Sequence, residues 1–239
     1  MGMKKSLAYR FISLIARPLM MVFTRRVWVG GERLRINSGV IVVSNHTSNF
    51  DPLVLAHFIN DNGRLPQFLA KAEVFKLPIA GALLRASGQI PVHRRTSLAA
   101  NALSDAEIAV KNGGTAVIYP EGTLTYDPNL WPMTGQSGAA RLALATKVPL
   151  FPVAQWGAHK VIPRWRKGLK LFPPQTLYVT CGQAVDLNDL YDREVNSELL
   201  ELATDRIMDA LTNTLAEIRN ETPPAVRWDR REVNEEGNL

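Results

Sequence analysis

The run Gly39-Val40-Ile41-Val42-Val43 leads into Ser44-Asn45-His46-Thr47-Ser48-Asn49-Phe50-Asp51, and this segment leads into Pro52-Leu53-Val54-Leu55-Ala56. The first run is short, apolar and β-branched, which predicts a buried strand, and the last begins with proline, which predicts a helix. One strand-to-helix loop therefore holds a histidine and a carboxylate. Residues five apart on a helix point about 140° away from each other, so His46 and Asp51 meet only if the loop folds back.

Two interpretations of this pair stay open on the stretch alone. A carboxylate that holds one imidazole nitrogen leaves the other nitrogen free to take a proton, which suits general base catalysis. Alternatively, Asp51 caps the helix that begins at Pro52, and His46 is a loop residue bonded to the backbone.

The rest of the chain predicts an α/β fold. Apolar runs predict strands at 40–44, 66–70, 89–92, 115–119, 149–154 and 177–181, and helical patterns lie at 52–60, 73–86, 96–111, 136–146 and 196–219. Alternating strands and helices favour a largely parallel mixed sheet flanked by helices, in which ligands bind beyond the carboxyl ends of the strands. Both His46 and Glu121 fall there. The Gly30-Gly31 turn signal predicts a hairpin over 27–36.

The composition supports one domain. The chain has 239 residues, 46% of them hydrophobic, and we expect the domain over 27–220, an N-terminal helical segment over 1–26 and a charged, mobile or loosely laid tail over 221–239. The single cysteine, Cys181, argues against a disulfide framework, fits a reducing compartment and is expected in the core.

The N-terminal segment favours a membrane surface over a membrane span. Most residues of this segment are apolar. Four polar residues recur at helical spacing and form one polar stripe on a helix: Ser6, Arg10, Ser13 and Arg17. Two arginines inside the run are costly at the centre of a bilayer, so an interfacial amphipathic helix is favoured, and no signal-peptide pattern is present. An amphipathic helix docked on the domain is the alternative.

The charge indicates an anionic partner. The net charge is +6 and the pI about 9.6, which fits a phosphorylated substrate, an anionic lipid or nucleic acid. We expect no nucleic acid, because the tryptophans are scattered among the basic residues. A metal site built from His46, Asp51, His93 and Glu121 is a weak alternative, because the chain has no H-x-x-E-H pair.

Further motifs follow the first loop at a characteristic spacing. Tyr119-Pro120-Glu121-Gly122-Thr123 follows the apolar run 115–118, Val148-Pro149-Leu150-Phe151-Pro152-Val153 follows a helical run, and Gly88-Gln89-Ile90-Pro91-Val92-His93-Arg94 lies between them and the first loop. From about Val40 to Val185 the chain resembles the glycerolipid acyltransferases with an H-x4-D motif, in particular bacterial 1-acylglycerol-3-phosphate acyltransferases.

The resemblance implies an activity. A fatty acyl group would move from acyl-CoA or acyl carrier protein to a hydroxyl of 1-acylglycerol 3-phosphate, forming phosphatidic acid without a cofactor. His46 would be the general base and Asp51 would fix its tautomer, and no enzyme nucleophile is needed, since the chain has no G-x-S-x-G elbow. Another glycerophosphate or lysolipid acceptor is the alternative. The partners would be membrane lipid and acyl-CoA, at the cytoplasmic face of the cell membrane, with the protein monotopic or peripheral.

The resemblance also implies how the acceptor is held. Arg94, assisted by Arg95 or Lys71, would bind its phosphate, and Glu121, Gly122 and Thr123 would contact the acceptor. The sequence departs from the family pattern at Leu124, where an arginine usually stands. A basic stretch could replace that arginine or meet anionic lipid or coenzyme A, and it comprises His159, Lys160, Arg164, Arg166, Lys167 and Lys170.

Overall fold

The computed structural model describes residues 14, 18, 20–92, 99–164 and 168–229. Its centre is a seven-stranded sheet of order β1-β7-β6-β2-β5-β3-β4. The strands are β1 (Thr24–Val29), β2 (Val40–Val43), β3 (Pro66–Lys71), β4 (Ile90–Val92), β5 (Thr115–Ile118), β6 (Leu150–Trp156) and β7 (Gln175–Cys181). Only β6 and β7 pair antiparallel, so the predicted largely parallel mixed sheet is confirmed.

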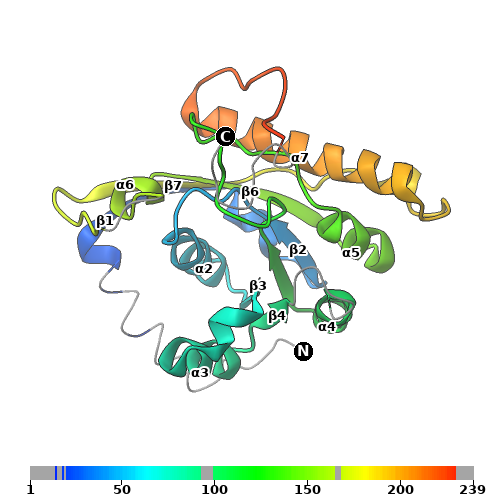
Figure 1. Cartoon of the computed structure of the whole chain (residues 1–239), viewed down its shortest axis with the longest axis horizontal. Helices are drawn as coiled ribbons and strands as arrows, with labels where there is room; N and C mark the ends of the chain where they lie inside the picture. Colours follow the sequence, from blue (N-terminus) through cyan, green and yellow to red (C-terminus); the bar gives the residue numbers. More distant parts are fainter. Residues whose placement is uncertain (1–13, 15–17, 19, 93–98, 165–167, 230–239) are drawn as a thin grey trace.

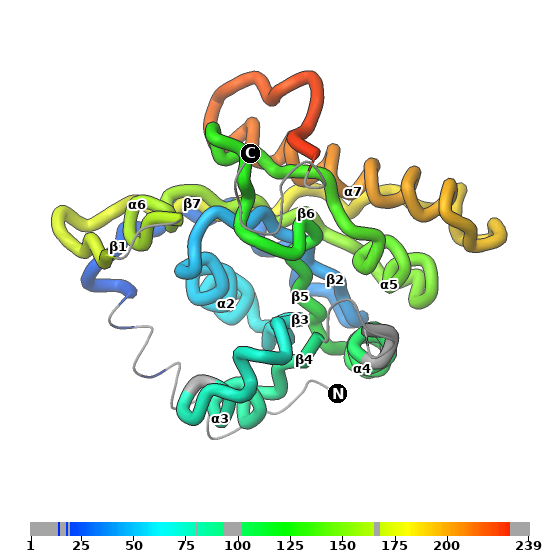
Figure 2. Tube along the Cα trace, viewed as in Figure 1, coloured from blue at the N-terminus to red at the C-terminus, as the bar shows by residue number. Residues whose placement is uncertain are grey.

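Helices cover both faces of this sheet (Figures 1 and 2). The α-helices are α2 (Asp51–Asp61), α3 (Pro78–Ala86), α4 (Ala99–Lys111), α5 (Gly138–Thr146), α6 (Ala158–Val161) and α7 (Ser197–Arg219), and the 3-10 turns are η1 (Gly31–Leu34), η2 (Ala72–Lys76) and η3 (Asn188–Leu190). Among the described residues, no helix is both long enough and apolar enough to cross a bilayer.

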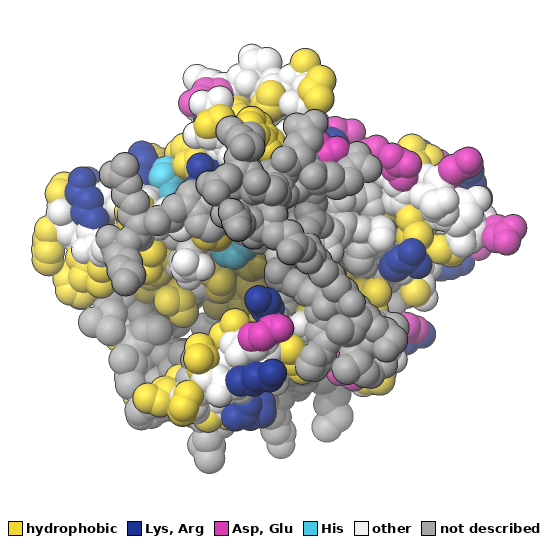
Figure 3. Space-filling view, viewed as in Figure 1, with side chains coloured by type: hydrophobic (Ala, Val, Ile, Leu, Met, Phe, Trp, Pro, Cys, Tyr) yellow, Lys and Arg dark blue, Asp and Glu magenta, His cyan; other side chains and the backbone are white. Residues whose placement is uncertain are grey.

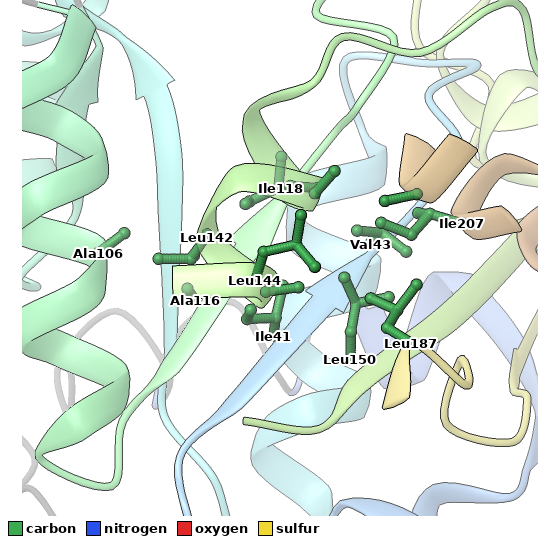
Figure 4. Packing of buried hydrophobic residues seen from close by; sticks show 14 of the residues in the cluster. Ile41, Val43, Ala106, Ala116, Ile118, Leu142, Leu144, Leu150, Leu187 and Ile207 are labelled. Carbon is green, nitrogen blue, oxygen red and sulfur yellow. The ribbon is translucent and has the colours of Figure 1, made fainter. Parts of the chain in front are cut away.

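The central strand β2 explains why the sheet is covered twice. All four of its residues are buried, and they alternate between two cores. Val40 and Val42 pack with α2 and η1, whereas Ile41 and Val43 pack with α4, α5 and α7 (Figure 4). Strands buried on both faces carry continuous apolar runs instead of alternating ones.

Two local predictions were wrong. The predicted hairpin over 27–36 does not form, because β1 pairs parallel with the distant β7 and Gly30, at φ 71°, leads into η1. The predicted helix over 73–86 is divided into η2 and α3, since Pro78 holds the preceding Leu77 in an extended conformation with ψ 131°.

The two ends of the chain are described only in part. Most of the segment 1–26 lies outside the described residues, and β1 begins within its last three residues. The described part of the C-terminal tail packs on the domain. Thr134 N donates to Trp228 O at 3.0 Å, and Arg227 forms ion pairs with Asp205 and Asp209 of α7.

Candidate active site

The loop between β2 and α2 folds back and brings His46 to Asp51. The Nδ1 atom of His46 lies 3.0 Å from Oδ2 of Asp51. The same oxygen accepts the backbone N–H groups of Thr47 at 2.6 Å and Ser48 at 2.8 Å. Asp51 is fully buried, and a carboxylate only accepts hydrogen bonds, so the imidazole proton lies on Nδ1. Among the described residues no group hydrogen-bonds Nε2 of His46, which leaves its lone pair available to take a proton.

Asp51 stabilises the loop and does not cap the helix. It is the first residue of α2, its carboxylate points back into the loop, and the preceding Phe50 makes no side-chain cap. Three hydrogen-bonded groups of the loop therefore depend on one carboxylate oxygen. This arrangement fixes both the path of the backbone and the orientation of the imidazole.

The loop after β5 holds His46 from the other side. Glu121 Oε1 accepts the N–H of His46 at 3.1 Å, and Thr125 N donates to the carbonyl of His46 at 2.7 Å. The second oxygen of Glu121 accepts from Met133 N at 3.0 Å. Burial raises the pKa of Glu121 from 4.5 to about 8, although these hydrogen bonds oppose the shift. Glu121 thus contacts the backbone of His46 and not its imidazole. The expected contact of Glu121 with the acceptor stays a prediction.

Gly122 has a left-handed backbone conformation, which favours glycine. Its φ is +72°, and a Cβ atom at this position would lie 2.2 Å from Nε2 of Gln136. Its N–H donates to Tyr119 O at 3.0 Å and closes a turn. The predicted contact of Gly122 with the acceptor stays a prediction. Thr123 is partly exposed beside it, and Leu124 is buried.

The predicted cation sites are only partly described. Lys71 ends β3 at the same carboxyl edge of the sheet as the His46 loop, is exposed, and lies 3.9 Å from Glu73. Arg94, Arg95 and His93 lie outside the described residues. Within the part of the chain that the structure describes, no three His, Cys, Asp or Glu side chains are grouped to hold a metal ion.

Part of the basic stretch does reach the site. Nη1 of Arg164 donates to the carbonyls of Thr125 at 2.6 Å and Asp127 at 2.7 Å, and Ser48 Oγ donates to Ile162 O at 2.7 Å. Burial and the charges of Lys160, Arg219 and Arg164 lower the pKa of His159 to about 4, so this histidine adds no positive charge at neutral pH. Arg166 and Lys167 lie outside the described residues, and Lys170 is exposed.

Two site residues were missed from the sequence. The phenol of Tyr119 stacks on the His46 imidazole with ring centroids 4.1 Å apart. Gln155 of β6 exchanges hydrogen bonds with Asn45: the Asn45 side chain donates to Gln155 O at 2.9 Å and accepts from Gln155 N at 2.8 Å. A polar residue inside the apolar run of β6 was the available signal for Gln155.

The fold and this histidine–carboxylate loop define an acyltransferase. The chain matches the model of the family described as Acyltransferase over residues 4–156, more than half of its 239 residues, and it belongs to that family. The matched region contains the His46 loop and the Glu121 loop.

Relatives agree with this assignment, and a solved structure has the same fold. The chain is 26% identical over 183 residues to the 1-acyl-sn-glycerol-3-phosphate acyltransferase of Borreliella burgdorferi, covering 76% of this chain and 70% of that one. It is 29% identical over 130 residues to the chloroplastic BAT2 enzyme of the same name from Brassica napus, covering 54% of this chain and only 36% of that one. The chain thus spans about a third of that relative's length. The crystal structure of the 1-acyl-sn-glycerophosphate (LPA) acyltransferase PlsC from Thermotoga maritima has the same fold, with a TM-score of 0.67, 24% identity and coverage of 90% of this chain and 81% of that one.

Proposed function

We propose that this protein transfers a fatty acyl group from a thioester, acyl-CoA or acyl carrier protein, to the free hydroxyl of 1-acylglycerol 3-phosphate and so forms phosphatidic acid. The observation that carries the proposal is the 3.0 Å contact between His46 Nδ1 and Asp51 Oδ2 in a loop at the carboxyl edge of the sheet. The names of the relatives support the choice of acceptor.

The chemistry needs one base and no enzyme nucleophile. Nε2 of His46 removes the proton from the acceptor hydroxyl as its oxygen attacks the thioester carbonyl carbon. The tetrahedral intermediate collapses, the carbon–sulfur bond breaks, and the proton on His46 passes to the leaving thiolate. Asp51, which holds Nδ1–H, stabilises the imidazolium during this cycle.

The acceptor phosphate needs cations in this mechanism. Arg94 is its main partner in the proposal, Lys71 stands at the same sheet edge, and Arg164 adds positive charge beside the Glu121 loop. Arg94→Ala should therefore raise the KM for the acceptor far more than the KM for the donor. A selective effect on the donor would assign Arg94 to coenzyme A.

The place of action follows from the acceptor. A lysophospholipid resides in the bilayer, so the enzyme works at a membrane surface, as a monotopic or peripheral protein on the cytoplasmic face, where its thioester donors are made. The net charge of +6 favours anionic lipid.

The decisive experiment is a direct transfer assay. Purified protein is incubated with a panel of acyl-CoAs or acyl carrier protein and with lysophosphatidic acid, glycerol 3-phosphate or other lysolipids, and the lipid products are identified by mass spectrometry. We expect phosphatidic acid from lysophosphatidic acid, and none with His46→Ala. If only a different lysolipid is acylated, that lipid and not lysophosphatidic acid is the acceptor. Leu124, which stands in place of the usual arginine, would then be the first position to examine. Undiminished transfer by a folded His46→Ala protein would end the mechanism.

A further inference from the structure

Helix α3 exposes apolar side chains instead of burying them. Ile79 is 78% exposed, and the exposed residues of α3 and the turn before it also include Val74, Leu77, Pro78, Ala82, Leu83 and Ala86. Monomeric soluble proteins rarely expose such contiguous apolar surface unless it meets a partner or a membrane. The apolar character of α3 therefore does not serve the domain core.

The way α3 is attached leaves this face outward. The helix packs mainly on η2, and it does so through Gly81, where a Cβ atom would lie 2.0 Å from the carbonyl oxygen of Phe75. Nη1 of Arg85 donates to the same carbonyl. The contact with the domain thus uses Gly81 and Arg85, whereas Leu77, Ile79 and Leu83 stay exposed.

Basic residues border the apolar face. Lys71, Lys76 and Arg85 are exposed around η2 and α3, against one acidic residue, Glu73. Figure 3 shows hydrophobic and basic side chains next to one another over this part of the molecule, below the centre of the view. An apolar helix face edged by Lys and Arg is the pattern of an element that lies in the headgroup region of an anionic bilayer.

We propose that α3, together with the end of η2, is a membrane-contact element that inserts Leu77, Ile79 and Leu83 among the headgroups of an anionic bilayer. The proposal rests on the proposed function, because a lipid acceptor brings the enzyme to a bilayer. Its position also fits, since η2 begins at the carboxyl end of β3, the edge at which the His46 loop lies.

The first test places a polarity-sensitive fluorophore on α3 of the full chain. The only native thiol, Cys181, is fully buried, and burial raises its pKa to about 12, so Ile79→Cys can be labelled selectively. Val226→Cys is the matched control: Val226 is 82% exposed and precedes Arg227, which forms ion pairs with Asp205 and Asp209 of α7. Helices α7 and α3 lie at opposite ends of the view in Figure 1. With vesicles of phosphatidylcholine and phosphatidylglycerol, the label at 79 should shift to the blue and be quenched by brominated lipid, and the label at 226 should not change.

Two outcomes would overturn the proposal. A label at 79 that is already in an apolar environment without vesicles, and does not change when they are added, would show that another part of the chain covers α3. Equal responses at 79 and 226 would show that vesicle contact is not specific to α3.

The second test measures binding by co-sedimentation with the same vesicles. Ile79→Glu should weaken binding roughly tenfold, since it replaces the burial of one large apolar side chain with a charge. Val226→Glu should bind as the unaltered protein does. Lys76→Ser should weaken binding to anionic vesicles and leave binding to neutral vesicles unchanged. Equal binding by the Ile79 and Val226 variants would refute the role of α3.

The outcome for α3 is separable from the outcome for the activity. Acyl transfer to a short-chain acceptor that is soluble in water does not need the bilayer, so the Ile79→Glu protein should keep it. If the unaltered protein transfers no acyl group but its α3 label responds to vesicles, the proposed activity fails and the membrane contact stands.

Discussion

The imidazole of His46 lies almost flat on the phenol ring of Tyr119, with the ring centroids 4.1 Å apart and the planes inclined by 19°. Tyr119 directly follows β5 and is partly buried, its hydroxyl is shielded from solvent near Asp51 and Gln155, and burial raises its pKa well above 10. A neutral aromatic ring therefore lies against one face of the His46 imidazole. It restricts the rotation of the imidazole and, in the proposed mechanism, favours the imidazolium that forms during transfer.

Replacing Tyr119 by leucine should lower kcat by about tenfold, because a cation over an aromatic face is stabilised by about 0.5–2 kcal/mol. Tyr119→Phe keeps the ring and should retain most of the kcat. Steady-state kinetics on both variants separate the stacking from the hydroxyl. Equal losses in the two variants would assign the effect to the hydroxyl.

His46→Ala should reduce kcat by about 100- to 10,000-fold, the usual contribution of a general base. The loop should stay folded, since its backbone is held by Glu121 and Thr125 on either side of His46. Circular dichroism and donor binding, measured by calorimetry with a non-transferable acyl-CoA analogue, provide the controls. A variant that fails to bind the donor would show that His46 has a structural role.

Asp51→Asn should lower kcat by about 100-fold. It should change the free energy of unfolding only slightly. The remaining amide oxygen can still accept from Thr47 N or Ser48 N, whereas the charge that stabilises the imidazolium is lost. Denaturant unfolding and kinetics on the same preparation make the comparison. Full activity would show that Asp51 only organises the loop.

Glu121 should make stability fall as the pH rises. Its pKa is about 8 in the folded protein and 4.5 as the ordinary value, so its contribution is fully present below pH 4.5 and is lost as the pH rises to about 8. The unfolding free energy of the unaltered protein minus that of Glu121→Gln should therefore decline by at least about 1 kcal/mol between pH 5 and pH 8.5, since one pKa unit corresponds to about 1.4 kcal/mol. Urea unfolding at several pH values measures it. A difference that grows with pH would mean that the carboxylate is stabilised in its charged form.

Gly122→Ala should destabilise the protein by about as much as the same change at a glycine with free space around it. Gly63 has a similar positive φ of +82° and nothing within 4 Å of the position of its missing Cβ, whereas a Cβ at Gly122 would meet the end of the exposed Gln136 side chain, which can turn aside. We expect a loss of about 1–2 kcal/mol at both positions from the left-handed conformation. Urea unfolding of both variants gives the comparison, and a clearly larger loss at Gly122 would show that Gln136 is held in place.

Local patterns predicted much of this structure. The strand–loop–helix unit around His46 and the terminal helix, predicted over 196–219 and found at Ser197–Arg219, follow from apolar periodicity and from capping residues such as Asn196. The spacing of His46 and Asp51 within one loop made the fold-back one of two possibilities, and the hydrogen bonds of the structure decide for it over helix capping by Asp51. These features depend on residues that are close in the sequence.

What the sequence did not reveal depends on distant partners. The pairing of β1 with β7 joins residues about 150 positions apart, which no local pattern encodes. Likewise, Trp131 and Trp156 are scattered in the sequence, yet both stack on Arg219, with 4.0 Å and 4.4 Å from its guanidinium carbon to the ring centroids. The stacking of Tyr119 under His46 is of the same kind, since two neighbouring parallel strands bring together loops more than 70 residues apart.

The antiparallel step from β6 to β7 reverses the direction of the last two strands of the sheet. Because β1 runs parallel to β7, its first residue, Thr24, lies at the edge where β2, β3 and β5 end, and not at the edge where they begin. Residues 20–23, which directly precede β1, therefore meet the sheet on the side of the His46 loop. A label or tether attached just ahead of Thr24 would stand at the edge of the sheet that carries this loop. One attached at the exposed Val226, next to the Arg227 that pairs with α7, would stand beside that helix instead, so the second position is the better choice for a labelled or immobilised enzyme.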